Sequence, residues 1–470
     1  MAENLYRLLP SVDQILASLE SEQWFSTMPR PLVRDQVNQY LDRLREEIRK
    51  SDITDQEELT WERLENPLRA FVISGARPNF RRVLNGTGVV IHTNLGRSIL
   101  AKEAAKAVSE ACAHYSNLEF NLETGERGSR YSHVEGLLCR LTGAEAALVV
   151  NNNAGAVFLI LDAMAKGKEV LVSRGQLVEI GGSFRIPDVM AKSGAKLVEV
   201  GTTNRTHSRD YENAITSETA ALMKVHASNF RITGFTSEVS LKELVDLGSK
   251  YGLPVIEDLG SGNFYNFAAL GLAYEPTVQE TVEAGADVIS FSGDKVLGGP
   301  QAGIIVGKKI YIDRIKANPL NRAVRIDKMT LAALEATLRL YLDPDQAREK
   351  IPTLAMISAR PKELKKRAER LRQRLKRHLG AHLKVKLLPG VSRAGGGSFP
   401  ERDLETTLVA LTPSSGTSVD DLKKTLLTTD PPLVGRIEED VFCLDPRTLT
   451  DEEFPLVVSV LAQALKNEKK

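Results

Sequence analysis

The feature that most limits the fold of this chain is a regular alternation of short apolar runs and helical segments from about residue 83 to about residue 345. The runs are rich in β-branched residues, and segments such as Ala154–Lys166 and Leu241–Tyr251 separate them. Strands joined by helical crossovers pair in parallel, and helices then cover both faces of the sheet. The expected strands are AALVV (146–150), EVLVS (169–173), KLVEV (196–200), AALMKVH (220–226), PVIEDL (254–259), DVISFS (287–292) and AGIIVG (302–307). We therefore predict an α/β domain with a mostly parallel sheet, whose ligands bind at the carboxyl ends of the strands.

Segments of different character flank this alternation, as expected for a chain of 470 residues. The first has helical periodicity, with a helix start at Pro10-Ser11 and an amphipathic helix over 31–50. The expected buried face of that helix is Val33, Val37, Tyr40, Leu41, Leu44 and Ile48. The last opens with a basic helix, PKELKKRAERLRQRLKRHL, continues with strands LKVKLL, TTLVAL and DVFCLD, and ends with a helix over Glu452–Leu465. We predict an N-terminal helical module (1–80), a large domain (81–345) and a small α+β domain (346–470).

Composition narrows the classes of protein to consider. Lys and Arg number 62 against 61 Asp and Glu, so only a local patch can attract a polyanion. No run approaches the roughly 20 apolar residues that span a bilayer, and the N-terminus does not resemble a secretory signal. The widely spaced Cys112, Cys139 and Cys443 suit a reducing compartment and form neither a disulfide framework nor a metal site. We expect a cytoplasmic protein whose partners include neither a membrane nor DNA.

Lys295 is the candidate reactive residue of the large domain. It follows the apolar run VISF in the stretch ADVISFSGDKVLGGPQAG, and Gly298 and Gly299 come soon after it. A lysine at the end of a buried strand, among glycines that let a flat ligand approach the backbone, suits covalent bonding to a carbonyl carbon. An ordinary exposed lysine in a loop is the alternative, and this stretch alone does not separate the two.

Two further features come at the ends of other expected strands. NNNAGAV (151–157) leads from a strand into a helix, where free backbone N–H groups and the helix dipole can hold a phosphate, although asparagines also cap helices structurally. PVIEDLGSG places Glu257 and Asp258 at a strand end, and either carboxylate can be the partner of a protonated pyridine nitrogen. Phosphate site, carboxylate and lysine in this order are typical of a pyridoxal 5′-phosphate (PLP) site. We therefore predict PLP as the cofactor, and no metal, because no histidine has metal-ligand spacing with Asp258.

Longer strings of the sequence point to one family. They are LLPSVDQIL, LNGTGVVIHTNLGRS, GERGSRYSHVEGLL, NNNAGAV, SRGQLVEIGGSFRIPDVM, VHASNFRITGF, EDLGSG, SFSGDKVLGGPQAGII and NPLNRAVRIDK. Together they resemble the bacterial selenocysteine synthases, the L-seryl-tRNA(Sec) selenium transferases, over nearly the whole chain and most strongly from about 80 to 345. The resemblance implies the aspartate-aminotransferase-like PLP-dependent transferase fold (fold type I). It also implies conversion of L-seryl-tRNA(Sec) to L-selenocysteyl-tRNA(Sec), by β-elimination and then selenium addition from selenophosphate, and a homo-oligomeric ring of dimers.

The resemblance implies roles for the residues of the PLP site. Lys295, in the string SGDK, would be the lysine that bonds to PLP, and Asp258 the partner of the pyridine nitrogen. The backbone around Asn152, Asn153 and Ala154 would hold the cofactor phosphate. The resemblance in the string EDLGSG thus selects Asp258 rather than Glu257 as the carboxylate that binds the pyridine nitrogen.

Arginines would bind the selenium donor. Arg97 in NLGRS and Arg322 and Arg325 in NRAVR match the arginines of the family, and planar cations with several donors suit a phosphate group. Surface ion pairing is the alternative for Arg322 and Arg325. Arg174, just past one strand, and His226, at the end of another, are candidate contacts of the PLP ring, and a hydrogen-bonded core histidine is the alternative for His226.

The N-terminal module would bind the tRNA through Arg34, Arg43, Arg45 and Arg49. The alternative is a solvated helix whose arginines pair with acidic residues one turn away. A rival function is a selenocysteine-synthase-like PLP lyase that acts on a small amino acid or amino-sugar acid. Such an enzyme would share the cofactor residues and would have no need of the N-terminal helices.

Overall fold

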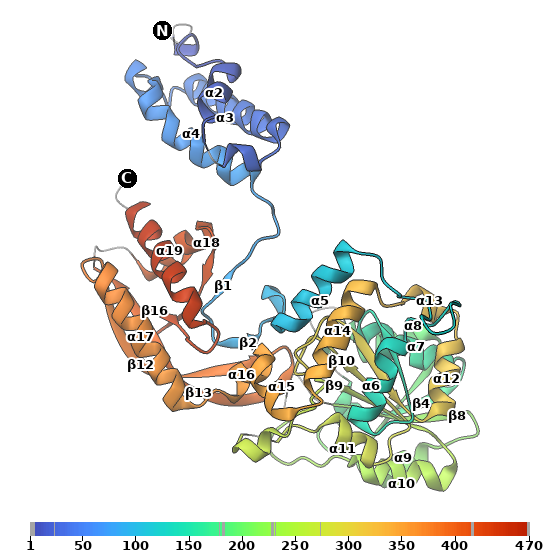
Figure 1. Cartoon of the computed structure of the whole chain (residues 1–470). Coiled ribbons are helices and arrows are strands. Elements are labelled where there is room, and N and C mark those ends of the chain that lie inside the picture. The colour runs from blue at the N-terminus through green and yellow to red at the C-terminus, as the bar shows by residue number, and fades with distance from the viewer. Residues whose placement is uncertain are drawn as a thin grey trace. The chain divides into compact units, whose positions relative to one another are not determined.

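The chain forms two compact units, Met1–Arg82 and Val83–Lys470. The structure is a computed structural model, and it describes residues 5–22, 24–177, 179–180, 184–226, 230, 232–272, 274–414 and 418–467. Figure 1 shows the whole chain coloured from the N-terminus to the C-terminus. None of the helices in these described ranges combines the length and the apolar character that a membrane span requires.

The N-terminal unit is helical, as predicted. Its elements are α2 (Val12–Leu19), η1 (Phe25–Thr27), α3 (Arg30–Lys50), η2 (Gln56–Leu59) and α4 (Trp61–Ala76). Ser11 caps α2 in a reciprocal pair of hydrogen bonds with Gln14, so the expected helix start is confirmed. The six residues predicted as the buried face of α3 are all buried, in a core that also receives the partly buried Trp24 and Trp61.

A seven-stranded sheet forms the centre of the second unit (Figure 1). Its strands are, in spatial order, β3 (Ala146–Val150), β11 (Gly303–Gly307), β10 (Val288–Ser292), β9 (Val255–Gly260), β8 (Thr219–Val225), β4 (Glu169–Ser173) and β7 (Lys196–Val200). All neighbours pair in parallel except β11, which is antiparallel to both β10 and β3. The prediction of a mostly parallel sheet built from these runs is confirmed.

Helices cover both faces of this sheet. Alternate residues of β3 enter different cores: Ala147 and Val149 pack in one with α6 and α14, and Leu148 and Val150 in another with α7 and α12. The helices and turns of this region are η3 (Thr93–Leu95), α5 (Lys102–Ala113), α6 (Ser132–Thr142), α7 (Asn153–Ala165), η4 (Arg174–Gln176), α8 (Ile186–Ser193), α9 (Ser208–Ala214), α10 (Leu241–Tyr251), η5 (Phe267–Leu270), α11 (Val278–Glu283), α12 (Lys309–Ala317), α13 (Leu320–Ala323), α14 (Lys328–Leu340), α15 (Pro344–Lys350) and α16 (Pro352–Ser358). A small hairpin, β5 (Glu179–Ile180) and β6 (Phe184–Arg185), precedes α8.

The C-terminal part has an α+β arrangement, with a separate five-stranded sheet in the order β15-β16-β13-β12-β2. Its elements are β2 (Val89–Ile91), α17 (Pro361–Leu379), β12 (Leu383–Gly395), β13 (Ser398–Pro413), α18 (Val419–Thr428), β15 (Arg436–Glu438), β16 (Val441–Leu444), η6 (Asp451–Glu453) and α19 (Phe454–Asn467). A separate pair joins β1 (Leu84–Asn85) to β14 (Leu433–Val434).

Two features of this part differ from the expectation. The runs LKVKLL and TTLVAL lie in a long antiparallel hairpin, β12–β13, rather than in short strands. In addition, β1 and β2 come from the start of the segment assigned to the large domain, and yet they pair with β14 and β12. The chain thus enters the large domain through the C-terminal sheet.

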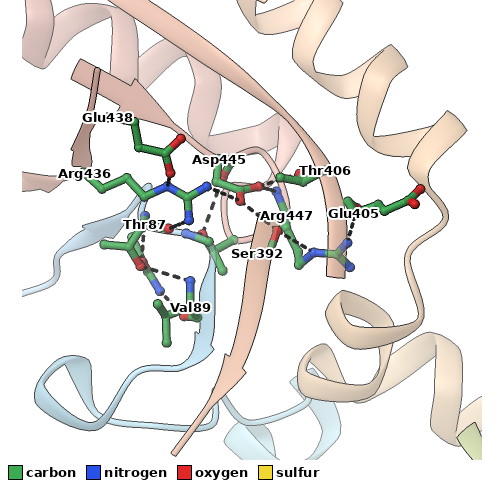
Figure 2. Close-up of polar contacts among 12 residues, drawn as sticks. Thr87, Val89, Ser392, Glu405, Thr406, Arg436, Glu438, Asp445 and Arg447 are labelled. Atoms are coloured by element: carbon green, nitrogen blue, oxygen red, sulfur yellow. Dashed lines mark hydrogen bonds and ion pairs between the residues drawn. The ribbon is translucent and has the colours of Figure 1, made fainter. Parts of the chain in front are cut away.

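A buried polar cluster fixes this entry (Figure 2). Asp445 is 0% exposed and accepts hydrogen bonds from the hydroxyls of Ser392 (2.7 Å) and Thr406 (2.9 Å). Arg447, 2% exposed, donates from Nε to Ser392 Oγ (2.8 Å). Arg436 donates to the carbonyl oxygen of Thr87 (3.1 Å), two residues before β2 begins. The cluster therefore ties β12, β13 and β16 to the segment that leads into β2.

Candidate functional site

Lys295 lies in a tight turn after β10 and is 6% exposed. Its carbonyl oxygen accepts hydrogen bonds from Ser98 Oγ (2.6 Å) and from the backbone N–H of Gly298 (3.0 Å). Burial lowers the pKa of its amine from the ordinary value; the negative charge of Asp258 opposes that shift, and the positive charge of Arg97 adds to it. The side chain is therefore not the ordinary exposed lysine that the sequence left as an alternative, and its amine gives up a proton more readily.

Asp258 is the carboxylate that faces Lys295. It lies near the end of β9, 5% exposed, and its Oδ1 accepts hydrogen bonds from Asn153 Nδ2 (2.8 Å) and Ser290 Oγ (3.3 Å). Burial raises the pKa of this carboxyl, while the bond from Asn153 and the charge of Lys295 act in the opposite direction. The pairing register of β9 and β10 places Ser290 beside Asp258. A buried carboxylate with these donors is ready to receive a protonated nitrogen.

The asparagine-rich string forms the first turn of α7. Asn152 is the N-cap, and its Oδ1 accepts the backbone N–H of Gly155 at 2.8 Å. Asn153 turns its side chain to Asp258, while the Oδ1 of the same amide is buried without a hydrogen-bond partner in the described part of the chain. The antiparallel strand β11 passes close by, because a Cβ on Gly303 would lie 2.1 Å from the carbonyl oxygen of Asn152. The turn thus joins a helix N-terminus to the Asp258 carboxylate.

Arg97, from the segment after β2, binds the residue that precedes Lys295. It follows η3 in the left-handed conformation (φ 62°), and its Nη1 lies 3.1 and 2.9 Å from the two carboxylate oxygens of Asp294. Asp294 directly precedes Lys295, and Ser98 holds the carbonyl of Lys295 itself. The segment that follows β2 is therefore clamped onto the lysine turn.

Arg322 and Arg325 line a different cavity, of about 350 Å³, at the carboxyl end of β3. Arg325 forms an isolated β-bridge with Val150, the last residue of that strand, and its guanidinium lies 3.7 Å from Glu119. Arg127 and Arg130 line the same cavity. The structure brings these four arginines together, whereas Arg97 is not among the residues that line this cavity.

The side chains of Arg174 and His226 each have an acidic partner in this structure. The guanidinium of Arg174 binds Glu199 (2.9 Å) and the carbonyl oxygen of Gly201 (2.8 Å), both on the β7 side of β4 and away from β9. The Nε2 of His226 lies 3.3 Å from Glu275 Oε1, and its ring lines a cavity with Glu257. Because side chains alternate along a strand, Glu257 and Asp258 point to opposite faces of β9.

Glu257 lines the same cavity as His226 and Glu275. It is 4% exposed, and burial raises the pKa of its carboxyl to about 7. Of the two neighbouring carboxylates, only Asp258 faces Asn153 and Lys295, in agreement with the choice that the family resemblance made.

Each of the four arginines predicted to bind tRNA pairs with an acidic residue. The pairs are Arg34–Asp13 (3.3 Å), Arg43–Glu47 (2.9 Å), Arg45–Asp42 (2.5 Å) and Arg49–Glu46 (2.7 Å). All four side chains remain more than half exposed. Exposed pairs of this kind contribute little stability, so a phosphate can replace the carboxylate at small cost.

The sequence analysis missed three residues that the structure places at the site. Asp294 and Ser98 contact Arg97 and the lysine turn, and Ser290 contacts Asp258. Asp294 and Ser98 are neighbours in sequence of residues already singled out, and Ser290 is in the apolar run before Lys295. A polar residue in an otherwise apolar buried strand was the available signal for Ser290.

Two family models match long stretches of this chain. Residues 83–450 match a family described as L-seryl-tRNA selenium transferase, and residues 6–45 match one described as selenocysteine synthase N terminal. The L-seryl-tRNA(Sec) selenium transferase of Maridesulfovibrio salexigens is 65% identical over 463 residues, 98% of this chain and 100% of the relative. That of Nitratidesulfovibrio vulgaris is also 65% identical, over 98% of this chain and 99% of the relative.

Among solved structures, D-glucosaminate-6-phosphate ammonia-lyase superposes with a TM-score of 0.57 at 22% identity, over 83% of this chain and 97% of that one. This similarity concerns the fold alone, and the predicted fold type I architecture is confirmed. The match to the family models and the identity to full-length relatives settle the assignment that the strings around Lys295 suggested. The chain belongs to the L-seryl-tRNA(Sec) selenium transferase family.

Proposed function

We propose that this chain is a PLP-dependent enzyme that converts L-seryl-tRNA(Sec) to L-selenocysteyl-tRNA(Sec), with selenophosphate as the selenium donor. The observation that carries the proposal is the 65% identity to L-seryl-tRNA(Sec) selenium transferases over the whole length of the chain. The N-terminal match argues against a lyase that acts on a small amino acid or amino-sugar acid, because it covers helices that such an enzyme would not need.

The residues around Lys295 fit PLP. The amine of Lys295 would bond to the cofactor aldehyde, Asp258 would bind the pyridine nitrogen, and the first turn of α7 would bind the phosphate. The side chain of Asn152 already accepts a hydrogen bond from the backbone N–H of Gly155. The backbone N–H groups of Asn153 and Ala154 would therefore donate to the phosphate. The unpartnered Asn153 Oδ1 is a buried polar atom that a polar ligand at this place can satisfy.

Each of these residues has a definite task in the reaction. When bound, PLP supplies an electron sink for the amino acid's α-carbon. The Lys295 amine would take the proton from Cα of the seryl group, and its lowered pKa favours the neutral form that can accept it. Asn153 and Ser290 hold the Asp258 carboxylate in position, where it would bind a protonated pyridine nitrogen. The hydroxyl group would leave Cβ as water, with the proton that Lys295 took from Cα. Selenium from selenophosphate would then bond to Cβ, and hydrolysis of its bond to phosphorus would release phosphate.

The arginines orient the donor. We assign the phosphate of selenophosphate to Arg322 and Arg325 at the end of β3, and we keep Arg97 as a cation whose charge acts on Lys295. Planar guanidinium groups bind phosphate oxygens in pairs, fix the direction of the selenium atom, and stabilise the phosphate that departs. Arg174 and His226 have no role in this scheme.

The partners that we propose for the chain are a tRNA and further copies of itself. The exposed arginines of α3 would bind tRNA phosphates. Tyr115, Phe120 and Leu122 are exposed around a hollow of about 620 Å³, and a second copy of the chain that covers these apolar side chains would begin the ring of dimers. The three cysteines are free thiols, which agrees with a cytoplasmic location.

The test is conversion of L-seryl-tRNA(Sec) by the purified full-length protein with PLP and selenophosphate. Lys295→Ala should lose both turnover and the visible absorbance of the bound cofactor. Lys166→Ala, which removes an exposed lysine paired with Asp162, is the matched control and should keep both. Turnover of free serine or of an amino-sugar acid, but not of the aminoacyl-tRNA, would favour the rival lyase.

A further inference from the structure

The cavity that holds Arg322 and Arg325 already contains an anion of the chain. Arg127, Arg130 and Lys316 add to its positive charge, and the carboxylate among its lining residues is Glu119. Arg127 and Arg130 come from the string GERGSRYSHVEGLL, to which the catalytic scheme gives no role. Glu119 is thus a single carboxylate among several cationic side chains of this cavity.

Glu119 binds three of the four arginines. Its Oε1 accepts hydrogen bonds from Nε (2.9 Å) and Nη2 of Arg130, and lies 3.7 Å from Arg325 Nη1. Its Oε2 accepts from Arg127 Nη2 at 3.3 Å. The bond from Arg130 holds the pKa of Glu119 below its ordinary value. One planar anion thus bridges guanidinium groups from two separate segments, as a phosphate would.

Of the arginines that bind Glu119, Arg130 is held more firmly than the carboxylate. Arg130 is 8% exposed and also donates from Nη1 to the carbonyl oxygen of Ile326. Glu119 lies in the connection between α5 and α6, where the backbone bonds Asn121 N to Glu126 O and Gly128 N to Glu119 O are local to the connection itself. Leu118 anchors the start of the connection on the core and its carbonyl oxygen contacts the His133 ring (3.2 Å), so a displaced Glu119 would move with the part of the connection that follows Leu118.

We propose that Glu119 is an internal anion that occupies the place of the donor's phosphate, and that the phosphate displaces it. Arg127 and Arg130 are then binding residues for that phosphate, together with Arg322 and Arg325. This inference rests on the proposed function, which assigns the donor to the same cavity. Before a donor arrives, Glu119 keeps the arginines paired and in position. It also lowers the apparent affinity for the donor, because a donor can bind only to the fraction of molecules in which Glu119 has left the site.

Affinity for inorganic phosphate tests the proposal without turnover. The PLP-loaded full-length protein is titrated with phosphate in a calorimeter, and wild type is compared with Glu119→Gln and Glu123→Gln. Loss of the competing charge should tighten phosphate binding by about tenfold in Glu119→Gln, because the competing bonds are charge-assisted. Glu123 is an exposed acid of the same connection, and its replacement should change the affinity by less than about twofold. Equal or weaker binding by Glu119→Gln, or no binding by either protein, would overturn the proposal.

A measurement on the wild type covers the case in which Glu119→Gln misfolds. Saturating phosphate should speed amide exchange in residues 117–128, since displacement of Glu119 releases the connection; slower exchange would mean that Glu119 stays in place and would refute displacement. The two proposals can also fail separately. If selenophosphate supports conversion but phosphate affinity is the same in wild type and Glu119→Gln, the inference is wrong and the proposed function stands. If Glu119→Gln binds phosphate more tightly but the wild type does not convert the aminoacyl-tRNA, Glu119 competes with phosphate and the proposed function is wrong.

Discussion

Replacement of Arg447 by methionine tests how the C-terminal sheet is held together. The guanidinium is buried, and it donates to Ser392 Oγ (2.8 Å), to Met356 O (2.7 Å) and to Glu405 O (2.7 Å). Burial also lowers the pKa of Arg447 to about 10, so the charge is already costly in the wild type. Methionine fills much of the same volume, restores none of the three bonds, and leaves Asp445 with less positive charge nearby.

The expected loss follows from these hydrogen bonds. Each acceptor left without a donor costs about 1–3 kcal/mol. Relief of the buried charge offsets part of the total, so the net loss should be about 3–5 kcal/mol, as for other buried ion pairs that lose one partner. Amide exchange in residues 383–395 and 403–413 measures it, because the opening equilibrium of these strands should rise by about a hundredfold to several thousandfold.

Arg370→Met is the matched control. Arg370 belongs to the same domain and pairs with Asp451 (2.6 Å), but both side chains are about half exposed. Its loss should cost less than about 1 kcal/mol. If Arg447→Met folds and exchanges within about tenfold of wild type in both strands, the reasoning about the buried cluster is wrong.

Four further outcomes follow from the site. The pH profile of PLP capture by the cofactor-free protein should have its midpoint below pH 10.5, because burial lowers the pKa of Lys295 from that value; a midpoint at or above pH 10.5 would contradict the shift. Asp258→Asn should move this profile to still lower pH, since the Asp258 charge raises the Lys295 pKa. Gly303→Ala should lose cofactor binding through the clash with Asn152 O, whereas Gly136→Ala, on an open face of α6, should be tolerated; equal effects would refute the close approach. Replacing Arg34, Arg43, Arg45 and Arg49 of α3 by glutamine should flatten the salt dependence of tRNA binding, by about one in slope for each phosphate that α3 no longer binds; an unchanged slope would remove these arginines from the interface.

The sequence predicted those parts of the structure that depend on local pattern. Strand runs and helices of the large domain lie within a residue or two of expectation, because burial on both faces gives continuous apolar runs. The pairing of β2 with β12 joins segments about three hundred residues apart in the sequence, and no local pattern encodes it.

Side-chain directions at strand ends were equally out of reach. Position alone made Arg174 and His226 equivalent to the other candidates, and the outcome depended on Glu199 and Glu275, which no motif contains. Glu119 was missed because a single acid in an irregular connection has no pattern to mark it. Strand position did predict that Lys295, Asp258 and Asn153 come together, since Asp258 lies near the end of one strand and the other two follow strands of the same sheet.

The placement of the tryptophans has a practical consequence. The chain contains two, and Trp24 and Trp61 both belong to the N-terminal unit, where they are partly buried against its helical core. Their fluorescence therefore reports on this unit alone, without a contribution from the sheets that carry Lys295 and Arg447. Titration with a tRNA, or mild denaturation, can be followed optically in the helical unit while the visible absorbance of bound PLP follows the other one. The unlabelled protein thus has a separate optical signal for each of its two units.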